Sequence, residues 1–272
     1  MTDRYCVFGH PVEHSKSPLI HAEFAHQTGQ SIEYSAIEAP LDGFVDAWRQ
    51  FVADGGRGAN VTLPFKQTAF EMCDTLSHRA KRAGAVNTLI LGGNGRTYGD
   101  TTDGVGLVRD LAYHRLELAG KRILVLGAGG AVRGLLEPLL QKAPSEVVIA
   151  NRTATKAQQL ADDFADLGKV QGGGYEDIQG TFDLVINGTS ASLAGDLPPL
   201  PEQLFNKGGW AYDMMYGSEP TVFLQWAGPR GAKLLDGLGM LVEQAAESFF
   251  LWRNVHPDTS MVRDTLRQSL NY

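Results

Sequence analysis

The chain has 272 residues, 43% of them hydrophobic, and a formal net charge of -7. This size allows a large core and favours two domains, and the negative charge argues against nucleic acid as a main partner. Its two cysteines, Cys6 and Cys73, suggest neither a disulfide framework nor a zinc site. The polar start and the lack of a membrane-length hydrophobic run predict a cytoplasmic protein without a membrane anchor, and no residue cluster suggests a bound metal.

The first hundred residues alternate between strand-like and helix-like segments. Ser17 is the expected N-cap of the first helix, since Pro18 suits the first helical position. A hairpin is expected around Gly92–Gly95, and a helix over 103–111 is expected to link the two halves. The other predicted strands are 4–9, 31–39 and 58–63, and the predicted helices are 18–28, 41–53, 66–73 and 77–83.

A glycine-rich turn follows the hydrophobic run Ile123–Leu126, which predicts a buried parallel strand. Gly127 allows a tight turn, and Gly129 and Gly130 let a ligand approach the backbone. Hydrophobic residues at helical spacing come next, so the N–H groups of the turn and the positive helix end suit a pyrophosphate. Val132 occupies the third position of the usual G-x-G-x-x-G spacing, and the alternative is a turn that binds nothing.

The segment after the next predicted strand, 146–150, bears on the choice of cofactor. NAD-binding folds have an acidic residue near this point for the ribose 2′-hydroxyl, whereas this chain has Asn151, Arg152 and Thr153. The guanidinium of Arg152 suits a 2′-phosphate, and Lys156 adds a second positive charge. NADP(H) is therefore favoured over NAD; the alternative is that Arg152 is a solvated loop residue.

The remaining elements complete an α/β prediction with two domains. Strands are predicted at 183–187, 209–213 and near 232–235, helices at 239–253 and 261–270, and a loop at Gln171–Gly174. An N-terminal α/β domain would comprise residues 1–103 plus 239–272, with the C-terminal helices returning to it. Residues 104–238 would form a Rossmann-type, doubly wound nucleotide-binding domain.

Four segments of the first domain place polar side chains where strands end: 14–18, 60–66, 85–88 and 99–104. Because ligands of α/β sheets lie outside the carboxyl ends of the strands, these segments predict a pocket for a small, hydroxylated molecule. Lys66 and Asp103 are the oppositely charged pair suited to proton transfer. The other candidates are Ser15 and Ser17 for a carboxylate, and Asn60, Thr62 and Asn87 for hydroxyls. Each residue taken singly also fits an ordinary cap, turn or surface position.

Eight motifs resemble the shikimate dehydrogenase family in its NADP-dependent biosynthetic form. They occur in family order and are Phe8–Pro18, Asn60–Lys66, Ala85–Thr88, Thr102–Gly104, Gly127–Ala131, Asn151–Thr153, Tyr212–Tyr216 and Asp236–Leu241. The resemblance implies reversible reduction of 3-dehydroshikimate to shikimate by NADPH, in the biosynthesis of chorismate and aromatic amino acids. Either a monomer or a homodimer is compatible with it.

The resemblance also implies a role for each matching residue. Lys66 and Asp103 would be the catalytic pair. The substrate carboxylate would be held by Ser15, Ser17 and Tyr216, and the ring hydroxyls by Thr62, Asn87, Asp103 and Gln244, with Asn60 close by. The cofactor would be held by Gly127, Ala128, Gly129, Gly130 and Ala131 at the pyrophosphate, Asn151, Arg152, Thr153 and Lys156 at the 2′-phosphate, Thr189 and Ser190 along its length, and Met214 and Gly237 beside the nicotinamide.

Three alternatives stay open at this point. An enzyme of the same family that also oxidises quinate, with NAD, would favour an acid near position 152, where this chain has arginine. A sensor that had lost catalysis would have little need of Lys66 and Asp103. The methylenetetrahydrofolate dehydrogenases share a two-domain layout but fit the paired serines, Ser15 and Ser17, poorly.

Overall fold

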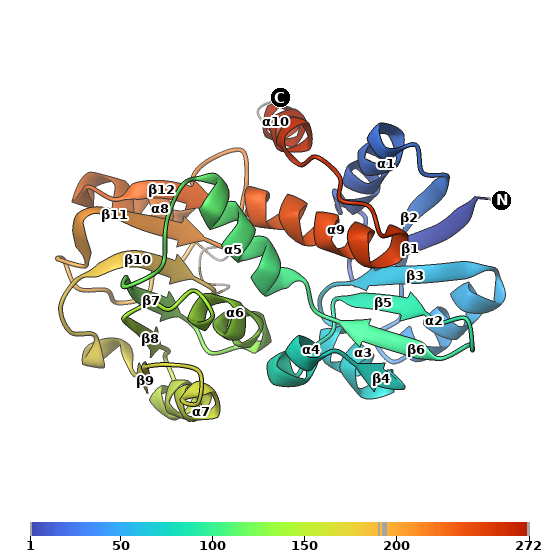
Figure 1. Ribbon diagram of the computed structural model, residues 1–272. Coiled ribbons are helices and arrows are strands. Elements are labelled where there is room, and N and C mark those ends of the chain that lie inside the picture. Colours follow the sequence, from blue (N-terminus) through green and yellow to red (C-terminus); the bar gives the residue numbers. More distant parts are fainter. Residues whose placement is uncertain (1, 190, 192–194, 271–272) are drawn as a thin grey trace. The chain divides into compact units, whose positions relative to one another are not determined.

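The computed structural model describes residues 2–189, 191 and 195–270, and it divides the chain into two compact α/β units (Figure 1). The chain up to Gly106 and the segment Val242–Thr265 form the first unit. Leu107–Leu241 and the chain from Leu266 form the second. In the part of the chain described, no helix is both long and hydrophobic enough to cross a membrane.

The first unit is built on a six-stranded mixed sheet in the order β2-β1-β3-β5-β6-β4. Strand β1 is parallel to β2 and β3, whereas β5 is antiparallel to both β3 and β6. The strands are β1 (Asp3–Gly9), β2 (Ile32–Glu38), β3 (Gly56–Val61), β4 (Thr75–Leu76), β5 (Thr88–Leu91) and β6 (Thr97–Asp100). The helices are α1 (Ser17–Thr28), α2 (Phe44–Ala53), α3 (Lys66–Met72) and α4 (His78–Ala83).

The starts of helices α1 and α2 differ from the predicted ones. Helix α1 begins at Ser17, and its N-cap is Lys16, whose backbone is already near-helical and whose side chain makes no capping bond. The prediction of Ser17 as the N-cap was therefore wrong by one residue. Helix α2 begins three residues later than predicted, because the preceding residues form a turn in which the N–H of Gly43 donates to the carbonyl of Pro40.

The second unit contains a six-stranded parallel sheet in the order β12-β11-β10-β7-β8-β9. Taken from its own first strand, this is the 3-2-1-4-5-6 order of the Rossmann fold, as predicted. The strands are β7 (Arg122–Leu126), β8 (Glu146–Ala150), β9 (Val170–Gly173), β10 (Phe182–Asn187), β11 (Phe205–Asp213) and β12 (Lys233–Asp236). The helices are α6 (Gly130–Leu140), α7 (Ala154–Phe164) and α8 (Val222–Ala227), with short turns η1 (Tyr175–Asp177) and η3 (Gly228–Arg230).

Three further helices carry the chain between the two units: α5 (Asp103–Tyr113), α9 (Leu238–Arg253) and α10 (Ser260–Leu270). Each begins within one residue of its predicted start. Two residues separate the end of β6 from the start of α5, whose first residue, Asp103, belongs to the first unit. The segment of α9 from Val242 also belongs to the first unit and brings Gln244 with it.

The prediction of a loop at Gln171–Gly174 was wrong, because most of this run forms β9 and pairs in parallel with β8. Glycine at position 172 has a packing reason. A Cβ atom there would lie 2.1 Å from the carbonyl oxygen of Ala157 in α7. Only a residue without a side chain lets α7 approach the strand so closely. The glycines that suggested a loop are therefore part of a strand.

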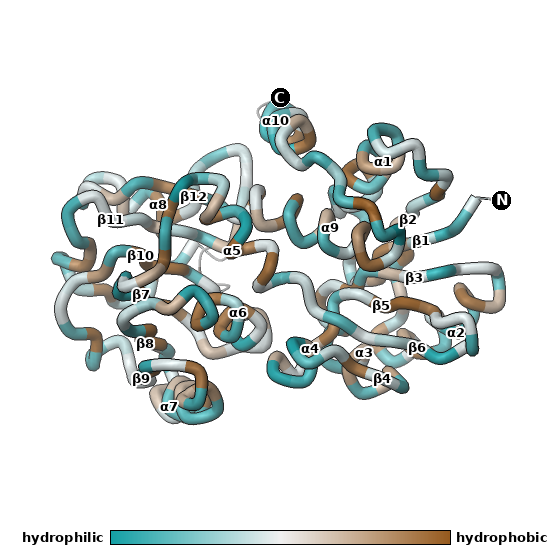
Figure 2. Tube along the Cα trace, in the orientation of Figure 1, coloured by the Kyte–Doolittle hydropathy of each residue, from teal (hydrophilic) through white to brown (hydrophobic). Residues whose placement is uncertain are grey.

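Strand residues of the second unit alternate between two hydrophobic clusters. Ile123 and Val125 pack in one cluster with α6 and α7, while Leu124 and Leu126 pack in the other with α8. Neighbouring strand residues point to opposite faces, so both faces of this sheet are buried, as in parallel sheets generally. Figure 2 colours each residue by its hydropathy, and hydrophobic stretches can be seen in α6 of this unit and in β5 of the first unit.

Candidate functional site

The predicted catalytic pair forms an ion pair in the first unit. Lys66 Nζ lies 2.5 Å from Asp103 Oδ2. The two side chains are 25% and 13% exposed, so water reaches the amine while most of the carboxylate is shielded. Such partial burial strengthens the attraction between the charges relative to a surface pair, and the pair can deliver or accept one proton.

Packing just before Lys66 fixes the start of α3. Phe65 is 2% exposed and stacks on Phe44 of α2 with ring centroids 5.0 Å apart. Phe44 in turn packs edge-on against Phe8 of β1. Because Phe65 is anchored in the core, the backbone of the next residue, Lys66, is held in place after the end of β3.

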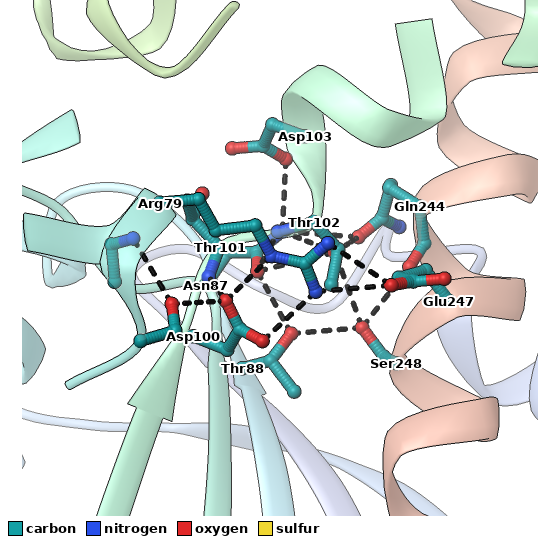
Figure 3. A network of polar contacts seen from close by, with 12 residues as sticks. Arg79, Asn87, Thr88, Asp100, Thr101, Thr102, Asp103, Gln244, Glu247 and Ser248 are labelled. Atoms are coloured by element: carbon teal, nitrogen blue, oxygen red, sulfur yellow. Dashed lines mark hydrogen bonds and ion pairs between the residues drawn. The ribbon is translucent and has the colours of Figure 1, made fainter. Parts of the chain in front are cut away.

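Asn87 ties Asp103 to the rest of the site (Figure 3). Its Nδ2 donates to Asp103 Oδ1 at 2.9 Å and to Gln244 Oε1 at 3.3 Å. Its Oδ1 accepts from the backbone N–H of Thr102 at 2.9 Å. Asn87 is 2% exposed, and its contacts bring the predicted residues Lys66, Asn87, Asp103 and Gln244 into one connected network.

A layer of buried hydroxyls lies beneath this network. Ser248 Oγ in α9 contacts Thr88 Oγ1 at 2.8 Å and Thr102 Oγ1 at 3.3 Å. Asn60 Nδ2 donates to Ser248 Oγ at 3.0 Å and to the carbonyl of Asn87 at 3.2 Å. Sequence reasoning missed Thr88, Thr102 and Ser248 as members of the site, although Thr88 and Thr102 stand inside two of the motifs.

The amide oxygen of Asn60 is held from the opposite side. It accepts from Tyr34 Oη at 2.7 Å and contacts His21 Nε2 at 3.2 Å. His21 is fully buried among aromatic rings and stacks on Tyr34 with ring centroids 4.2 Å apart. All the hydrogen-bonding positions of the Asn60 amide thus have protein partners, so it supports Asn87 and Ser248. Its predicted contact with a substrate stays a prediction.

Replacing His21 by glutamine is expected to flatten the acid dependence of stability. Burial lowers the pKa of His21 to about 3, while the hydrogen bond with Asn60 acts in the opposite direction. Below its ordinary pKa of 6.5 the unfolded chain binds a proton that the folded chain refuses, so stability falls as the pH drops from 6.5 towards 3. The wild type should lose roughly 2–3 kcal/mol more than the variant between about pH 7 and about pH 4.5.

The free energy of unfolding in urea at these two pH values measures the effect. The variant-minus-wild-type difference isolates His21 from other titrating groups. Equal pH dependence in the two proteins would contradict the neutral, buried state of this histidine.

The remaining predicted substrate residues of the first unit lie at the same edge of the sheet. Ser17 is 7% exposed, and its N–H donates to Ser15 Oγ at 3.3 Å, just at the start of α1. Thr62 directly follows β3, and a Cβ atom on Gly9 at the end of β1 would lie 2.6 Å from Thr62 Cγ2.

Tyr216, the third residue predicted to hold the substrate carboxylate, belongs to the second unit. Burial first, and then the Asp236 carboxylate, raise the pKa of Tyr216, so its hydroxyl stays a neutral hydrogen-bond donor.

The predicted pyrophosphate turn has the expected shape. Gly127 has φ +105°, and Gly129 is the N-cap of α6. Cβ atoms on Gly129 and Gly130 would meet nothing within 4 Å, so the backbone of this turn is open to a ligand. A groove of about 300 Å³ begins here and is lined by Ala128, Gly129, Gly130, Arg133, Thr155, Lys156, Gln159, Leu160 and Asp163. These residues fit a dinucleotide phosphate.

The structure places the other 2′-phosphate candidates after the strand next to this groove. Strand β8 ends at Ala150, and Asn151, Arg152 and Thr153 follow, with Arg152 exposed. Asn151 Nδ2 donates to the carbonyl of Thr153 at 3.0 Å, which shapes the turn. Arg133, which sequence reasoning missed, also lines the groove and pairs with Asp163 at 2.5 Å. Its position three residues after Gly130 was the available signal.

Replacing Gly127 by alanine is expected to lower stability by about 1–3 kcal/mol, because a φ of +105° strains any residue with a Cβ atom. The new Cβ would also lie 3.3 Å from the carbonyl of Gly188.

Gly129→Ala is the matched control, since the backbone at position 129 is neither strained nor crowded. We expect Gly129→Ala to keep its stability and to weaken NADP(H) binding; urea unfolding and cofactor titration measure both. Equal stability of the two variants would refute the strain at Gly127.

The nicotinamide-side candidates lie together in the second unit. A Cβ on Gly237 would stand 2.0 Å from the carbonyl oxygen of Met214, so only glycine allows this approach. The buried side chain of Asn187 accepts from Thr189 Oγ1 at 2.7 Å and donates to Asp213 Oδ2 at 3.1 Å. These bonds fix the ends of β10 and β11, where Thr189 and Met214 follow. Ser190 lies outside the described residues.

The fold and these groups define a class of protein: an α/β oxidoreductase with a lysine–carboxylate pair in the first unit and a Rossmann-type nucleotide fold in the second. The comparisons with known proteins make the class specific. Three family models match: "Shikimate dehydrogenase substrate binding domain" over residues 7–89, "Shikimate / quinate 5-dehydrogenase" over 110–194, and "Shikimate 5'-dehydrogenase C-terminal domain" over 237–267.

Similar whole proteins agree. The chain is 66% identical to the shikimate dehydrogenase (NADP(+)) of Chromohalobacter salexigens, over 98% of this chain and 99% of that one, and 56% identical to that of Cellvibrio japonicus, over 100% and 99%. The crystal structure of shikimate 5-dehydrogenase from Thermus thermophilus, in complex with NADP(H) and shikimate, has a TM-score of 0.88 at 35% identity and covers 99% of this chain and 100% of that one. The chain therefore belongs to the shikimate dehydrogenase family, and the resemblance seen in the sequence is confirmed.

Proposed function

We propose that this chain catalyses the reversible, NADP(H)-dependent reduction of 3-dehydroshikimate to shikimate, in the biosynthesis of chorismate and aromatic amino acids. The observation that carries the proposal is the Lys66–Asp103 ion pair, which Asn87 holds at the edge of the first sheet. Family membership supplies the substrate class, and the ion pair supplies the groups that a ketone reduction needs for proton transfer.

NADP(H) fits the second unit. Gly127 to Ala131 would hold the pyrophosphate at the open turn before α6, and Asn151, Arg152, Thr153 and Lys156 would hold the 2′-phosphate. Thr189 and Ser190 would lie along the cofactor, with Met214 and Gly237 beside the nicotinamide. When bound, the reduced cofactor supplies the hydride, and the protein supplies orientation and the proton.

Lys66 would protonate the substrate oxygen. In the reduction the C3 carbonyl oxygen gains negative charge, and the Lys66 ammonium can stabilise that charge and then donate its proton. The lysine becomes a neutral amine and regains a proton from water, which its 25% exposed side chain can reach. In the oxidation of shikimate the same steps run in reverse, and Lys66 accepts the proton.

Asp103 would hold both the lysine and a substrate hydroxyl. Its Oδ2 accepts from Lys66 and its Oδ1 from Asn87, so both carboxylate oxygens are held. Gln244, Asn87 and Thr62 would bond the other ring hydroxyls, with Asn60 close by, and Ser15, Ser17 and Tyr216 would bind the carboxylate. A small polyhydroxylated acid satisfies such a set of donors and acceptors.

The finer assignments follow from the same proposal. Residues 1–103 plus 239–272 would bind the substrate and residues 104–238 the cofactor. We propose a cytoplasmic enzyme that is a monomer or a homodimer and that works on small molecules alone, with no nucleic acid partner and no metal.

The test compares shikimate and quinate as substrates, each with NADP and with NAD, by the absorbance of the reduced nicotinamide. Rapid reduction of NADP with shikimate alone supports the proposal. Comparable rates with quinate and NAD would favour the broader quinate-oxidising form of the family. Binding of shikimate without reduction of either cofactor would favour a sensor that has lost catalysis.

A further inference from the structure

Arg79, which none of the sequence motifs contains, is partly buried and forms an ion-pair cluster with two buried carboxylates (Figure 3). Its Nε donates to Asp100 Oδ1 at 2.7 Å and its Nη2 to Asp100 Oδ2 at 2.8 Å, a bidentate pair. Nη1 and Nη2 both donate to Glu247 Oε1 at 3.0 Å. The Asp100 and Glu247 side chains are 4% and 9% exposed, so this is not a surface pair that solvent would weaken.

On one side the cluster fixes the turn that leads to Asp103. Asp100 is the last residue of β6, and its Oδ1 also accepts from the backbone N–H of Thr101 at 2.7 Å. Ser77, the N-cap of α4, donates to the same oxygen at 2.5 Å. Asp100 is therefore the point where α4, β6 and the segment before Asp103 are joined.

On the other side the cluster fixes α9. Glu247 lies about one helical turn after Gln244 in α9. The residue after it, Ser248, contacts Thr88 and Thr102. Gln244 shares the Asn87 amide with Asp103. One guanidinium thus joins the two separate segments that present Asp103 and Gln244.

The charges explain why arginine is needed at this position. Burial alone would lower the pKa of Arg79, but the hydrogen bonds and charges of Asp100 and Glu247 raise it above its ordinary value. Without this cation, two buried carboxylates would lose their common partner, which is strongly unfavourable. A lysine would keep the charge but could not make the planar, two-sided contact.

We propose that Arg79 is a positioning residue of the reductase site: through Asp100 and Glu247 it sets Asp103 and Gln244 relative to each other and to Lys66. The inference rests on the proposed function. It predicts that a change at Arg79 disturbs turnover and shikimate binding together, because both residues shift, while the cofactor end of the reaction is untouched.

The experiment uses Arg79→Lys in the full chain. We expect kcat to fall roughly 10- to 100-fold, as for a misplacement of about 1 Å at a catalytic group. The KM for shikimate should rise several-fold and the KM for NADP should stay unchanged. Arg122→Lys is the matched control, since Arg122 pairs with the buried Glu146 in the second unit; it should lose stability with kcat intact. If Arg79→Lys does not fold, Glu247→Gln, which keeps the shape of the side chain, takes its place.

A double-mutant cycle separates positioning from mere stabilisation. In an Asp103→Asn background the same change at Arg79 should lower kcat by less than about threefold, because the group being positioned is already disabled. Full kcat in Arg79→Lys, or an equal loss with and without Asp103, would overturn the proposal. Failure of the wild type to oxidise shikimate would instead overturn the proposed function, so the two failures are distinguishable.

Discussion

Replacing Lys66 by methionine is expected to lower kcat for shikimate oxidation by about 10²–10⁴-fold, the usual contribution of a positioned proton-transfer group. Methionine keeps much of the hydrophobic stem of lysine but removes the ammonium that lies 2.5 Å from Asp103 Oδ2. The KM for shikimate should change far less, because the missing interaction grows only as charge develops on the reacting oxygen. Initial rates of NADP reduction over a range of shikimate concentrations measure both constants.

Lys81→Met is the control for Lys66→Met. Lys81 lies in α4 of the same unit and is exposed, so its loss should leave both constants near the wild-type values. Preserved turnover with a large rise in KM would assign Lys66 to substrate binding and leave the proton transfer without its donor.

Most strands of the Rossmann unit could be predicted from local sequence, whereas helices α7 and α8 were not predicted. Its central strands, such as 122–126 and 146–150, are continuous hydrophobic runs because both sheet faces are buried. The start of the Gly127–Gly130 turn is explicit in the sequence because a φ of +105° favours glycine at position 127. β9 was missed since glycine at position 172 reflects close packing on α7 rather than turn formation.

The candidate site could be predicted only in part. Lys66, Asn87 and Asp103 were found through motifs, yet their hydrogen bonds join residues up to 157 positions apart. The ion pair between Arg79 and Glu247 spans 168 positions. Hydrophobic periodicity shows which face of an element is buried, but it does not show which buried polar groups pair with one another. That information appears only once the strands and α9 are assembled.

This difference has a physical cause. Hydrophobic burial is non-directional, so a run or a periodic pattern of hydrophobic residues is enough to indicate it in the sequence. A buried carboxylate such as Asp100 needs partners at defined distances and angles, and those partners can come from any segment that the fold brings near. The polar layer beneath Asn87 is therefore a property of the tertiary structure.

Replacing Arg152 by alanine is expected to raise the KM for NADP roughly 10- to 100-fold, since a charge-assisted hydrogen bond contributes about 1.5–3 kcal/mol. The KM for NAD should hardly change, because NAD has no 2′-phosphate for the guanidinium to bind. Arg152→Asp should go further and reverse the preference, since a carboxylate repels the phosphate and can accept from the 2′-hydroxyl. Steady-state rates with each cofactor at saturating shikimate measure the ratio.

The exposure of Arg152 adds a second, independent signature to this last prediction. Because its side chain faces solvent beyond the end of β8, dissolved salt should screen its attraction for the phosphate. The preference of the wild type for NADP should therefore shrink as ionic strength rises, and that of Arg152→Ala should not.

Lys207→Ala is the matched control. Lys207 is also an exposed cation of the second unit, but it lies near the start of its strand, β11, whereas Arg152 follows the end of β8. The loss of Lys207 should therefore leave the KM for NADP and the KM for NAD unchanged. Equal losses for NADP and NAD in Arg152→Ala would mean that the arginine shapes the turn. An unchanged ratio of the two KM values would mean that the 2′-phosphate is bound instead by Lys156 and Arg133, the cations that line the adjoining groove.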